Sequence, residues 1–397
     1  MTSPDGAEVI VIGGGVVGAA ILWALSDQRG SAALLLEQRT PASGATGSSS
    51  AIVRVHYTNP WESLLAVASL NIFRNWKDRV GGTCGYNPTG FLRIVGPADA
   101  DRLAKNVAIL TGLGADLHQV NLTDLQELEP DLSLEGIGAA AYEPYGGYAD
   151  PSDTTVSLLH SAAQNGARIA LGQKVTKIRI EHGRVEGVET STGRVACDVV
   201  VLAAGAWSTE LLSASGVNLA LRPRLIRAGF LRRPKGGRHM TIMDDSIGTY
   251  VKPEGQSGTE FGLHYEWDVD PDRFTSSVPF SLVADGVAHL ITRFPVMAIA
   301  GIVRGWGAVD SFTPDGVPVI SPIADIEGLL VASGFSGTGF KIAPAVGLSI
   351  AALIAGQNPP LNITPFAADR FSTGKPMTSH LDYRRAPWRQ ESPATHA

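Results

Sequence analysis

The residues with the clearest chemical potential are three glycines and one carboxylate near the N-terminus. Gly13, Gly15 and Gly18 have the spacing G-x-G-x-x-G. In this pattern the successive glycines permit a sharp turn, a close approach of backbone amides to a phosphate, and tight packing of a helix. Glu37 follows about 20 residues after the last glycine, where a carboxylate receives a ribose hydroxyl. The pattern therefore predicts a binding site for a dinucleotide.

The elements that must hold these residues lie on either side of them. Residues 9–12 read Val-Ile-Val-Ile, four apolar, β-branched residues typical of a buried parallel strand. A helix is expected over residues 16–27, with the positive end of its dipole toward the phosphates. A second strand over residues 32–36 ends at Glu37. This order of strand, glycines, helix, strand and acid favours a dinucleotide site over a simple tight turn.

Two neighbouring segments could complete such a site. Residues 38–50 are rich in Gly, Ser, Thr, Ala and Pro. They form either a flexible linker or, as we favour, a loop at the carboxyl end of a strand, where ligands bind in open α/β sheets. Arg54, His56 and Tyr57 are clustered just after this loop. We interpret His56 as a supporting neighbour of Arg54 rather than as a base.

Composition narrows the class of protein. The 397 residues have room for two domains, and 44% hydrophobic with 18% charged residues is typical of a soluble globular protein. The formal net charge of −6 gives no electrostatic case for nucleic acid. Two cysteines, Cys84 and Cys197, cannot form a disulfide framework. Without a signal peptide, a membrane span, metal-ligand spacing or a hydrolase nucleophile motif, we expect a cytoplasmic location and no metal.

Further along the chain, helical and extended patterns alternate. The predicted helices cover residues 62–79, 99–113, 153–165 and 343–355. The predicted strands cover residues 91–95, 137–142, 199–203 and 329–332, with a short antiparallel meander over 168–171, 175–181 and 185–190. Residues 220–305 indicate an antiparallel sheet with one face over a ligand. From residue 301 the chain is expected to return to α/β character, and the polar segment after 372 to be poorly ordered or to lie on the surface.

The combination of motifs resembles the D-amino-acid oxidase superfamily of flavoproteins, and within it the sarcosine oxidase and glycine oxidase-like group. Besides the glycine triplet with Glu37, the motifs are SGATGSS at 43–49, VLAAGAWS at 201–208, TPDGVP at 313–318 and GFSGTGFK at 334–341. The likeness covers nearly the whole chain, to about residue 372.

This resemblance implies an α/β fold, in which a Rossmann-like FAD-binding domain carries an inserted, mainly antiparallel-sheet substrate domain. The FAD-binding domain is expected to be discontinuous and to comprise residues 1–85, 147–222 and 306–372. The substrate domain is expected over residues 86–146 and 223–305, and a C-terminal tail over 373–397.

The resemblance also implies the residues that contact FAD. They are Gly13, Gly15, Val16, Val17, Gly18, Glu37, Gln38, Arg39, Ser43, Thr46, Ser48, Ser49, Val175, Ala204, Gly205, Trp207, Gly307, Asp315, Gly334, Gly337, Thr338, Gly339, Phe340 and Lys341. The glycine-rich loop 334–339 precedes a helix, so its amides and the helix dipole can stabilise negative charge on reduced flavin. Asp315 could instead be a simple turn residue.

Four side chains are implied at the substrate. In the family pattern, an Arg at the position of Arg54 and a Lys at that of Lys341 hold the substrate carboxylate over the flavin. Tyr250 and His264 match the spacing of an active-site tyrosine and histidine, which could bind a carboxylate and tune protonation. The alternatives are a surface or phosphate-neutralising Arg54, a solvated Lys341, and a buried structural Tyr–His pair.

The same resemblance bears on the flavin linkage and on the electron acceptor. Covalent relatives attach flavin through a Cys whose position here is Ala308, so we expect non-covalent FAD. A Lys that promotes reaction with oxygen is replaced by Glu260, and Lys252 would share a strand face with Tyr250 as its substitute. The acceptor is therefore oxygen or, as we favour, another acceptor such as a quinone, a dye or a partner protein.

The sequence thus predicts an FAD-dependent amine or amino-acid oxidase or dehydrogenase. It would oxidise the C–N bond of an amine or N-substituted amino acid, similar to sarcosine, glycine or a D-amino acid, to an imine by hydride transfer to flavin N5. The alternatives are a 2-hydroxy-acid dehydrogenase on the same fold, a non-catalytic FAD-holding subunit of a larger complex and, more weakly, an NAD enzyme. The substrate's identity, the oligomeric state and the role of the tail stay open.

Overall fold

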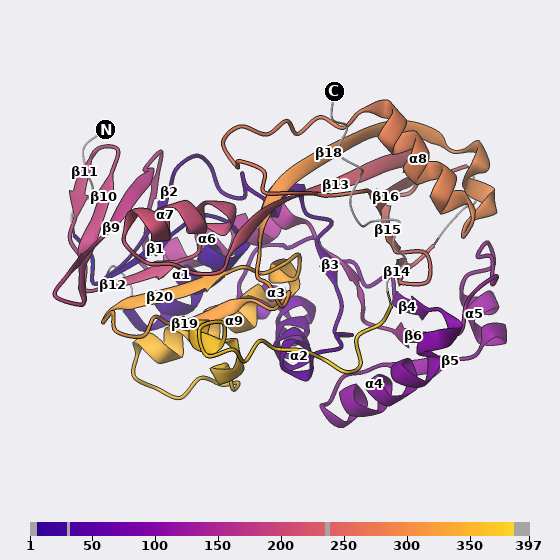
Figure 1. Cartoon of the computed structure of the whole chain (residues 1–397), viewed down its shortest axis with the longest axis horizontal. Helices are drawn as coiled ribbons and strands as arrows, with labels where there is room; N and C mark the ends of the chain where they lie inside the picture. The colour runs from indigo at the N-terminus through magenta and orange to yellow at the C-terminus, as the bar shows by residue number, and fades with distance from the viewer. Residues whose placement is uncertain (1–5, 30–31, 235–238, 385–397) are drawn as a thin grey trace.

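The computed structural model describes residues 6–29, 32–234 and 239–384. Residues 385–397 of the predicted tail, and the short stretches of the predicted domains at 1–5, 30–31 and 235–238, lie outside the described residues. Figure 1 shows two sheets side by side, one on the left of the view and one on the right, with helices packed on both.

The left-hand sheet has six strands within the described part of the chain. In their order across the sheet they are β19 (Val319–Pro322), β20 (Leu329–Ser333), β12 (Val199–Leu202), β1 (Val9–Ile12), β2 (Ala33–Glu37) and β8 (Arg168–Leu171). All neighbours run parallel except β19 with β20. Val9 of β1 lies opposite Val199 of β12 and Ala33 of β2, so the predicted first strand is confirmed at the centre of the sheet.

Both faces of this sheet are covered, as a parallel sheet requires. Helices α1 (Val16–Arg29), α6 (Pro151–Gln164) and α9 (Gly339–Ile354) pack together on one face, with α2 (Pro60–Arg74) against α9. The other face carries β9 (Val175–Glu181), β10 (Arg184–Thr190), β11 (Gly193–Val195) and α7 (Ser208–Ala214). Along β1 the side chains alternate, because Val9 and Val11 join the first core and Ile10 and Ile12 the second.

The right-hand sheet has nine strands within the described residues. In order they are β17 (Glu266–Trp267), β13 (Arg222–Arg232), β16 (Gly258–Gly262), β15 (Thr249–Glu254), β14 (Thr241–Asp244), β4 (Phe91–Val95), β6 (Ala139–Glu143) and β5 (His118–Val120), with β18 (Gly301–Phe312) along β13. Only β14 and β4 pair in parallel. The predicted fold class, a Rossmann-like part with a mainly antiparallel sheet, is confirmed.

The remaining elements are short or lie at the edges of the two sheets. The helices are α3 (Trp76–Arg79), α4 (Ala100–Gly112), α5 (Leu122–Leu128) and α8 (Phe280–Ile291). The 3-10 turns are at Thr46–Ser48, Pro97–Asp99, Gly205–Trp207, Pro295–Ile299, Thr364–Phe366 and Ala368–Arg370. Strands β3 (Ile52–Val53) and β7 (Gly147–Tyr148) form a small antiparallel pair. None of the helices in the described ranges is long and apolar enough to cross a membrane.

Two predicted elements need correction, and one helix was not predicted. Residues 168–171 do not belong to the antiparallel meander, because β8 follows helix α6 and pairs in parallel with β2, as in a strand–helix–strand crossover. The predicted helix 62–79 is interrupted at Asn75, whose φ of −117° and ψ of 30° are not helical. The helix α8 was not predicted; it lies within the segment that was expected to be all strands.

The chain returns to the parallel sheet later than expected. Residues 301–309 do not begin α/β structure, because β18 continues to Phe312 as a strand paired along the whole of β13. The expected domain boundary at residue 306 therefore falls inside β18. The division into an FAD-binding domain and a substrate domain stays a prediction.

The last described residues run along the outside of the molecule, with some of their side chains buried. Figure 1 shows this segment in yellow, running past α2 toward β4. Leu381 and Tyr383 within it are buried, at 5% and 8% exposure. The segment is therefore packed onto the protein rather than loosely draped.

Candidate active site

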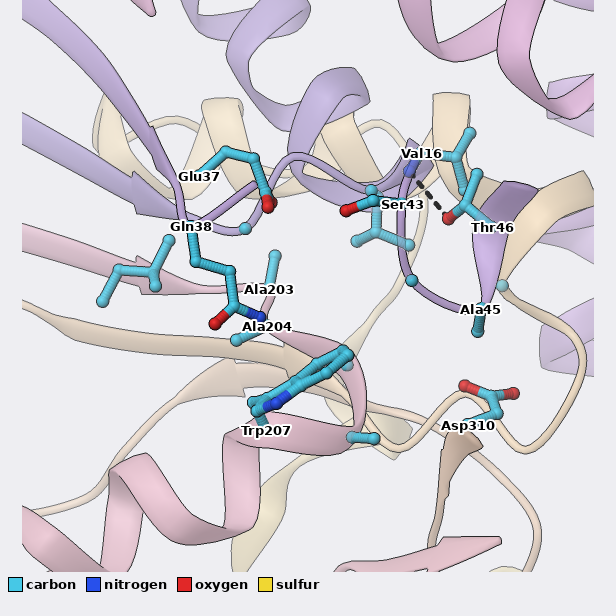
Figure 2. Close-up of a pocket in the computed structure, with 18 of the residues that line it drawn as sticks. Val16, Glu37, Gln38, Ser43, Ala45, Thr46, Ala203, Ala204, Trp207 and Asp310 are labelled. Carbon is cyan, nitrogen blue, oxygen red and sulfur yellow. Dashed lines mark hydrogen bonds between the residues drawn. The ribbon is translucent and has the colours of Figure 1, made fainter. Parts of the chain in front are cut away.

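A deep pocket of about 320 Å³ opens beyond the carboxyl ends of β1, β2 and β12. This is where ligands bind in open α/β sheets, and the volume lies in the usual range for ligand sites. Most residues that the sequence analysis assigns to the cofactor line it, namely Gly13, Gly15, Val16, Val17, Glu37, Gln38, Arg39, Ser43, Thr46, Ser49, Val175, Ala204, Gly205, Trp207, Gly337, Gly339 and Phe340. Figure 2 shows several of them facing one another across the cavity.

The glycine loop between β1 and α1 has the geometry that its spacing predicts. Gly13 has a φ of +110°, and a Cβ there would lie 2.5 Å from the carbonyl oxygen of Ala203. A Cβ on Gly18 would lie 2.0 Å from the carbonyl oxygen of Gly13. Gly18 therefore does not line the pocket but lets α1 start close behind the loop. The positive end of the α1 dipole faces the cavity beside Val16.

The carboxylate of Glu37 is fixed at the edge of the pocket by backbone amides. Its Oε2 accepts a hydrogen bond of 2.6 Å from the amide of Gly14, and its Oε1 accepts one of 2.7 Å from the amide of Arg39. On the neighbouring loop, the amide of Val16 donates to Thr46 Oγ1 at 3.1 Å (Figure 2). The predicted loop 38–50 is thus held against the glycine turn and lines the cavity.

The opposite wall is formed by Trp207 and Asp310 (Figure 2). The indole of Trp207 donates to Asp272 Oδ1 at 2.8 Å, which fixes the ring. Asp310 Oδ2 accepts from the amide of Gly337 at 3.0 Å, and burial raises the pKa of Asp310. Asp310 was not predicted, because it belongs to none of the sequence motifs and its strand was expected to end earlier.

The pocket also contains lining residues that were not predicted to contact the cofactor. Besides Asp310 they are Ile12, Leu36, Gly44, Ala45, Gln173, Lys174, Thr176, Ala203, Ala206, Glu210, Leu211, Val309, Ala332 and Phe335. Many of them are direct sequence neighbours of predicted residues, and they could have been predicted from that adjacency. Gln173 and Lys174 had no such signal beyond their place before Val175.

Five further predicted cofactor residues lie beside the pocket rather than in its lining. They are Ser48, Gly307, Gly334, Thr338 and Lys341. The carbonyl of Ser48 accepts from the indole nitrogen of Trp306 at 3.1 Å. Gly334 has a φ of +70°, a conformation that favours glycine. Thr338 directly precedes helix α9, whose first residue lines the pocket. The five residues therefore support the lining residues without lining the pocket themselves.

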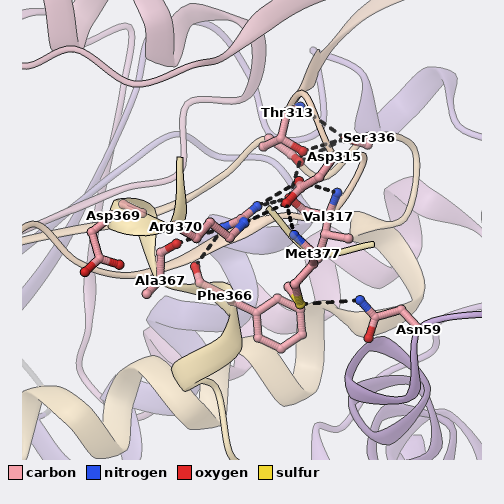
Figure 3. A network of polar contacts seen from close by, with 12 residues as sticks. Asn59, Thr313, Asp315, Val317, Ser336, Phe366, Ala367, Asp369, Arg370 and Met377 are labelled. Carbon is pink, nitrogen blue, oxygen red and sulfur yellow. Dashed lines mark hydrogen bonds and ion pairs between the residues drawn. The ribbon is translucent and has the colours of Figure 1, made fainter. Parts of the chain in front are cut away.

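Asp315 lies outside the pocket and has structural partners (Figure 3). Its carboxylate accepts from Arg370 at 2.8 Å and 3.0 Å and from the amide of Met377 at 2.9 Å. Burial opposes its charge, but the hydrogen bonds from Arg370 and Met377 lower the pKa of Asp315. Asp315 also accepts from the amide of Val317 at 3.2 Å, which fits the alternative of a turn residue, and in addition it anchors the C-terminal segment.

Arg54 and Lys341, predicted to act together, are brought together beside the pocket, although neither lines it. Both are buried, each at 6% exposure. The Arg54 guanidinium lies 4.2 Å from the centre of the Tyr57 ring, and Lys341 Nζ lies 5.8 Å from the same ring. Lys341 Nζ also donates at 3.4 Å to the carbonyl of Gly337, which lines the pocket. The two cations therefore face one aromatic ring beside the cofactor cavity.

Two buried acids that the sequence analysis missed accompany these cations. Glu143 accepts from the amides of Val55 and His56 at 2.7 Å and 2.9 Å. Glu62 lies in the first turn of α2, and burial raises its pKa to about 7. Burial and the charge of Arg54 lower the pKa of Lys341 to about 7. No motif indicated either acid, since both come from elements far from the glycine loops in sequence.

Several polar atoms at this end have no hydrogen-bond partner among the described residues. They are Arg54 Nε, Tyr57 Oη and Glu62 Oε1, all buried. A buried polar atom without a partner is costly, so such atoms mark places where a ligand can complete the hydrogen bonding. A guanidinium and an ammonium near one ring suit an anion such as a carboxylate.

Tyr250 belongs to a second buried group next to this one. Its ring packs with Ile52 and Phe91, and the Arg54 guanidinium lies 5.8 Å from the centre of the Phe91 ring. The Tyr250 hydroxyl lies 2.8 Å from Ser50 Oγ and 3.4 Å from Glu260 Oε1, and Ser50 also bonds Glu260. Tyr250 and Arg54 thus share Phe91 as a neighbour, while Tyr250 does not line the pocket.

Lys252 and His264 are the remaining predicted side chains, and neither lines the pocket. Lys252 Nζ forms ion pairs of 2.6 Å with Glu254 and 3.2 Å with Glu260. Lys252 and Tyr250 therefore both reach Glu260, as their shared strand face predicts. His264 is half-buried in the connection after β16 and does not line the pocket.

The pocket fits a dinucleotide cofactor. The glycine turn and the start of α1 provide close backbone approach for a pyrophosphate, and Glu37 is held at the far end of β2, where a ribose binds. The remaining length of the cavity, toward Gly337 and Phe340, leads to the buried cations. Within the described residues, no group of three or more His, Cys, Asp or Glu side chains could hold a metal ion.

Such a fold and pocket define a dinucleotide-binding protein, and comparison with known proteins specifies the family. The chain matches the model of the "FAD dependent oxidoreductase" family over residues 8–353. It belongs to this family, which confirms both the resemblance seen in the motifs and FAD as the cofactor.

Individual relatives are more distant. Glycine oxidase of Geobacillus kaustophilus is 26% identical over 376 residues, which cover 91% of this chain and 97% of that protein. Human mitochondrial sarcosine dehydrogenase is 25% identical over 93% of this chain, but the chain spans only 42% of its length. The crystal structure of L-proline dehydrogenase from P. horikoshii superposes with a TM-score of 0.87 at 24% identity, covering 94% of this chain and all of that one.

Proposed function

We propose that this protein oxidises the C–N bond of an amine or N-substituted amino acid to an imine, which water then converts to a carbonyl product. The observation that carries the proposal is the pair of buried cations, Arg54 and Lys341, which face the Tyr57 ring beside the cofactor pocket. The names of the relatives, a glycine oxidase and a sarcosine dehydrogenase, support the same class of substrate.

Arg54 and Lys341 are proposed to bind the substrate carboxylate. Arg54 presents a planar donor fork, of which Nε has no partner among the described residues, and Lys341 adds a point charge. Tyr250 and Ser50, hydrogen-bonded to each other, are proposed to contribute hydroxyl groups at the same end. Holding the substrate in one orientation is the main contribution that such side chains make to the rate.

The chemistry requires a neutral amine, because an ammonium has no lone pair with which to assist loss of hydride. The positive charges of Arg54 and Lys341 disfavour an ammonium nearby and so favour the neutral form. FAD, when bound, accepts the two electrons and the hydrogen that leave the carbon next to nitrogen. His264 is proposed to tune protonation from the edge of the substrate part.

We propose that the FAD is bound without a covalent link. Cys84 and Cys197 are both free and buried, and neither lines the pocket. Ala308 stands at the position expected for a linking cysteine. Acid precipitation should therefore leave the yellow colour in the supernatant, whereas colour in the pellet would contradict the proposal. Free cysteines also support a cytoplasmic location, which we propose on that ground.

An acceptor other than oxygen is proposed to reoxidise the flavin. Burial works against the charge of Lys252, but Glu260 and Glu254 raise its pKa, so the lysine is charged and its charge is compensated by two carboxylates. A compensated cation stabilises superoxide poorly. Flavin reduced anaerobically and then mixed with aerated buffer should regain its absorbance more slowly than turnover with an artificial dye. Fast reoxidation with stoichiometric peroxide would make the protein an oxidase.

The test of the proposed function is anaerobic reduction of the bound flavin. The purified protein should be yellow, and its visible flavin absorbance should bleach with a member of a panel of amines, N-methyl amino acids and D-amino acids. Bleaching only by 2-hydroxy acids would identify a hydroxy-acid dehydrogenase. No bleaching with any compound of the panel would favour a subunit that holds FAD without catalysis.

A further inference from the structure

Tyr383, in the C-terminal segment, reaches into the protein beside the predicted site. Its hydroxyl lies 2.7 Å from His56 Nε2 and 3.0 Å from Asn106 Nδ2, which donates to it. His56 and Asn106 are buried, at 0% and 1% exposure. Three side chains from distant parts of the sequence therefore meet at one point, and one of them is only two residues from Arg54.

The contacts of His56 continue to Arg54. Arg54 Nη1 donates to the carbonyl oxygen of His56. Asn106 Nδ2 also donates at 2.9 Å to the carbonyl oxygen of Tyr57, whose ring contacts the guanidinium. The His56–Tyr383–Asn106 network thus fixes the backbone of the two residues that contact the Arg54 side chain.

The segment that carries Tyr383 is fastened on both sides of it. On one side, the amide of Met377 donates to Asp315 at 2.9 Å (Figure 3), and Ser379 Oγ donates to the carbonyl of Thr58 at 2.8 Å. On the other side, the amide of Arg384 donates to Asp99 Oδ2 at 2.7 Å. These anchors hold the tyrosine in place independently of His56.

His56 itself does not supply a charge to the site. Burial, together with the positive charges of Arg93 and Arg54, lowers its pKa well below the ordinary value. A neutral imidazole in contact with a tyrosine hydroxyl and an amide is suited to holding a neighbour in place rather than to acid–base work. This agrees with our interpretation of His56 as a supporting neighbour of Arg54.

We propose that Tyr383 is a positioning residue for substrate binding, which holds Arg54 through His56 and so makes the C-terminal segment part of the carboxylate site. This inference rests on the proposed role of Arg54. It assigns a function to a segment that neither the glycine motifs nor the family match, which ends at residue 353, covers.

The experiment uses the full-length protein with bound FAD and measures acetate, a carboxylate without an oxidisable C–N bond, by its perturbation of the flavin absorbance. Tyr383→Phe keeps the ring and removes the hydroxyl. We expect the dissociation constant of acetate, and the KM of any reducing amino acid, to rise about three- to tenfold, as for loss of one hydrogen bond. FAD content and kcat should be unchanged. His380→Gln, three residues away on the same segment and exposed, is the control and should bind acetate normally.

A double-mutant cycle separates positioning from a general structural effect. In the Arg54→Met background, Tyr383→Phe should cause no further loss of acetate affinity, because the residue acts through Arg54. An equal loss in both backgrounds, or no loss in either, would overturn the inference.

The same measurement distinguishes the inference from the proposed function. If no amine reduces the flavin but acetate binding depends on Tyr383 only when Arg54 is present, the inference holds and the proposed reaction fails. If acetate does not bind the unmodified protein, the carboxylate role of Arg54 fails and the inference fails with it. If Tyr383→Phe loses FAD, Asn106→Asp tests the same network from its other side. A loss of acetate affinity only when Arg54 is present would support the inference, and an equal loss in both backgrounds, or none in either, would overturn it.

Discussion

The two ends of the active site are built from different chemical groups, main chain at one end and charged side chains at the other. At the pyrophosphate end the structure offers main chain, because the glycine turn, the start of α1 and the loop 38–50 approach the cavity closely. At the substrate end it offers buried side-chain charges, with Arg54 and Lys341 next to Glu62 and Glu143. The first end is assembled within about 40 residues of chain, as is usual for this fingerprint, whereas the second draws on four separate elements.

The difference has an energetic meaning. A site made of backbone amides and glycines needs little more than the correct turn conformation. Buried charges, by contrast, cost several kcal/mol each to remove from water, and they persist only where other groups compensate them. Burial shifts the pKa values of Lys341 and Glu62 to about 7, because it disfavours the charged form of each group. Such shifts concentrate at functional sites, so the charged end is where we expect substrate selection.

The largest expected effect is at the charged end. Arg54→Met should weaken acetate binding and slow anaerobic flavin reduction by about 2–4 kcal/mol, because it removes a buried charge-assisted contact. FAD content should stay at the unmodified level, since Arg54 does not line the cofactor pocket. The exposed Arg273→Met, at 86% side-chain exposure, is the matched control and should behave normally. Equal reduction rates in both variants would contradict the proposed binding of the substrate carboxylate by Arg54.

A complementary effect is expected at the backbone end. Glu37→Gln should lower FAD affinity by about 1.5–3 kcal/mol, the range for hydrogen bonds to a charged group. The new amide also places a donor against the amide of Gly14, which now donates to the carboxylate. Flavin reduction at saturating FAD should remain normal. Glu327→Gln, 73% exposed on the surface, provides the control by fluorescence titration of FAD. Slower reduction in FAD-saturated Glu37→Gln would show that the two ends are not separable.

A smaller effect is the pH dependence of acetate binding. Below about pH 7 Lys341 is charged and Glu62 is neutral, and above it Lys341 loses its proton while Glu62 becomes anionic. Both changes disfavour an anion, so acetate affinity should fall by about tenfold per pH unit for each proton involved. Glu62→Gln and Lys341→Met should each remove part of this dependence. The double variant should keep only the part due to Glu143, whose pKa burial also raises to about 7. A double variant with the same pH dependence as the unmodified protein would refute the assignment.

The same comparison explains what the sequence could predict. The glycine turn, Glu37 and the loop that follows were predictable because their spacing is local and their residue types have one conformational use. Arg54 and Lys341 could be named only through family resemblance, since nothing in their own neighbourhood distinguishes them from surface cations. Glu62, Glu143 and Asp310 were missed because their burial depends on elements that the sequence does not bring together.

Errors in the fold have a similar origin. Strand β8 was assigned to the meander because a short strand near two others suggests hairpins, whereas the preceding helix α6 carries it back to β2. The end of β18 was placed too early because its pairing partner, β13, lies some 80 residues away in the chain, roughly the span of an inserted unit. The packing of the C-terminal segment depends on Tyr383, whose partners His56 and Asn106 are remote in sequence.

The central claim is that buried cations select a substrate by its carboxylate while the flavin oxidises the neighbouring C–N bond. The most direct test compares, under anaerobic conditions, flavin reduction by the best amino acid of the panel with reduction by the amine that lacks only its carboxylate. We expect the amino acid to be preferred by about 30-fold or more, equivalent to roughly 2 kcal/mol, and the preference to disappear in Arg54→Met. Reduction of the unmodified protein by the amine as fast as by the amino acid would contradict the claim.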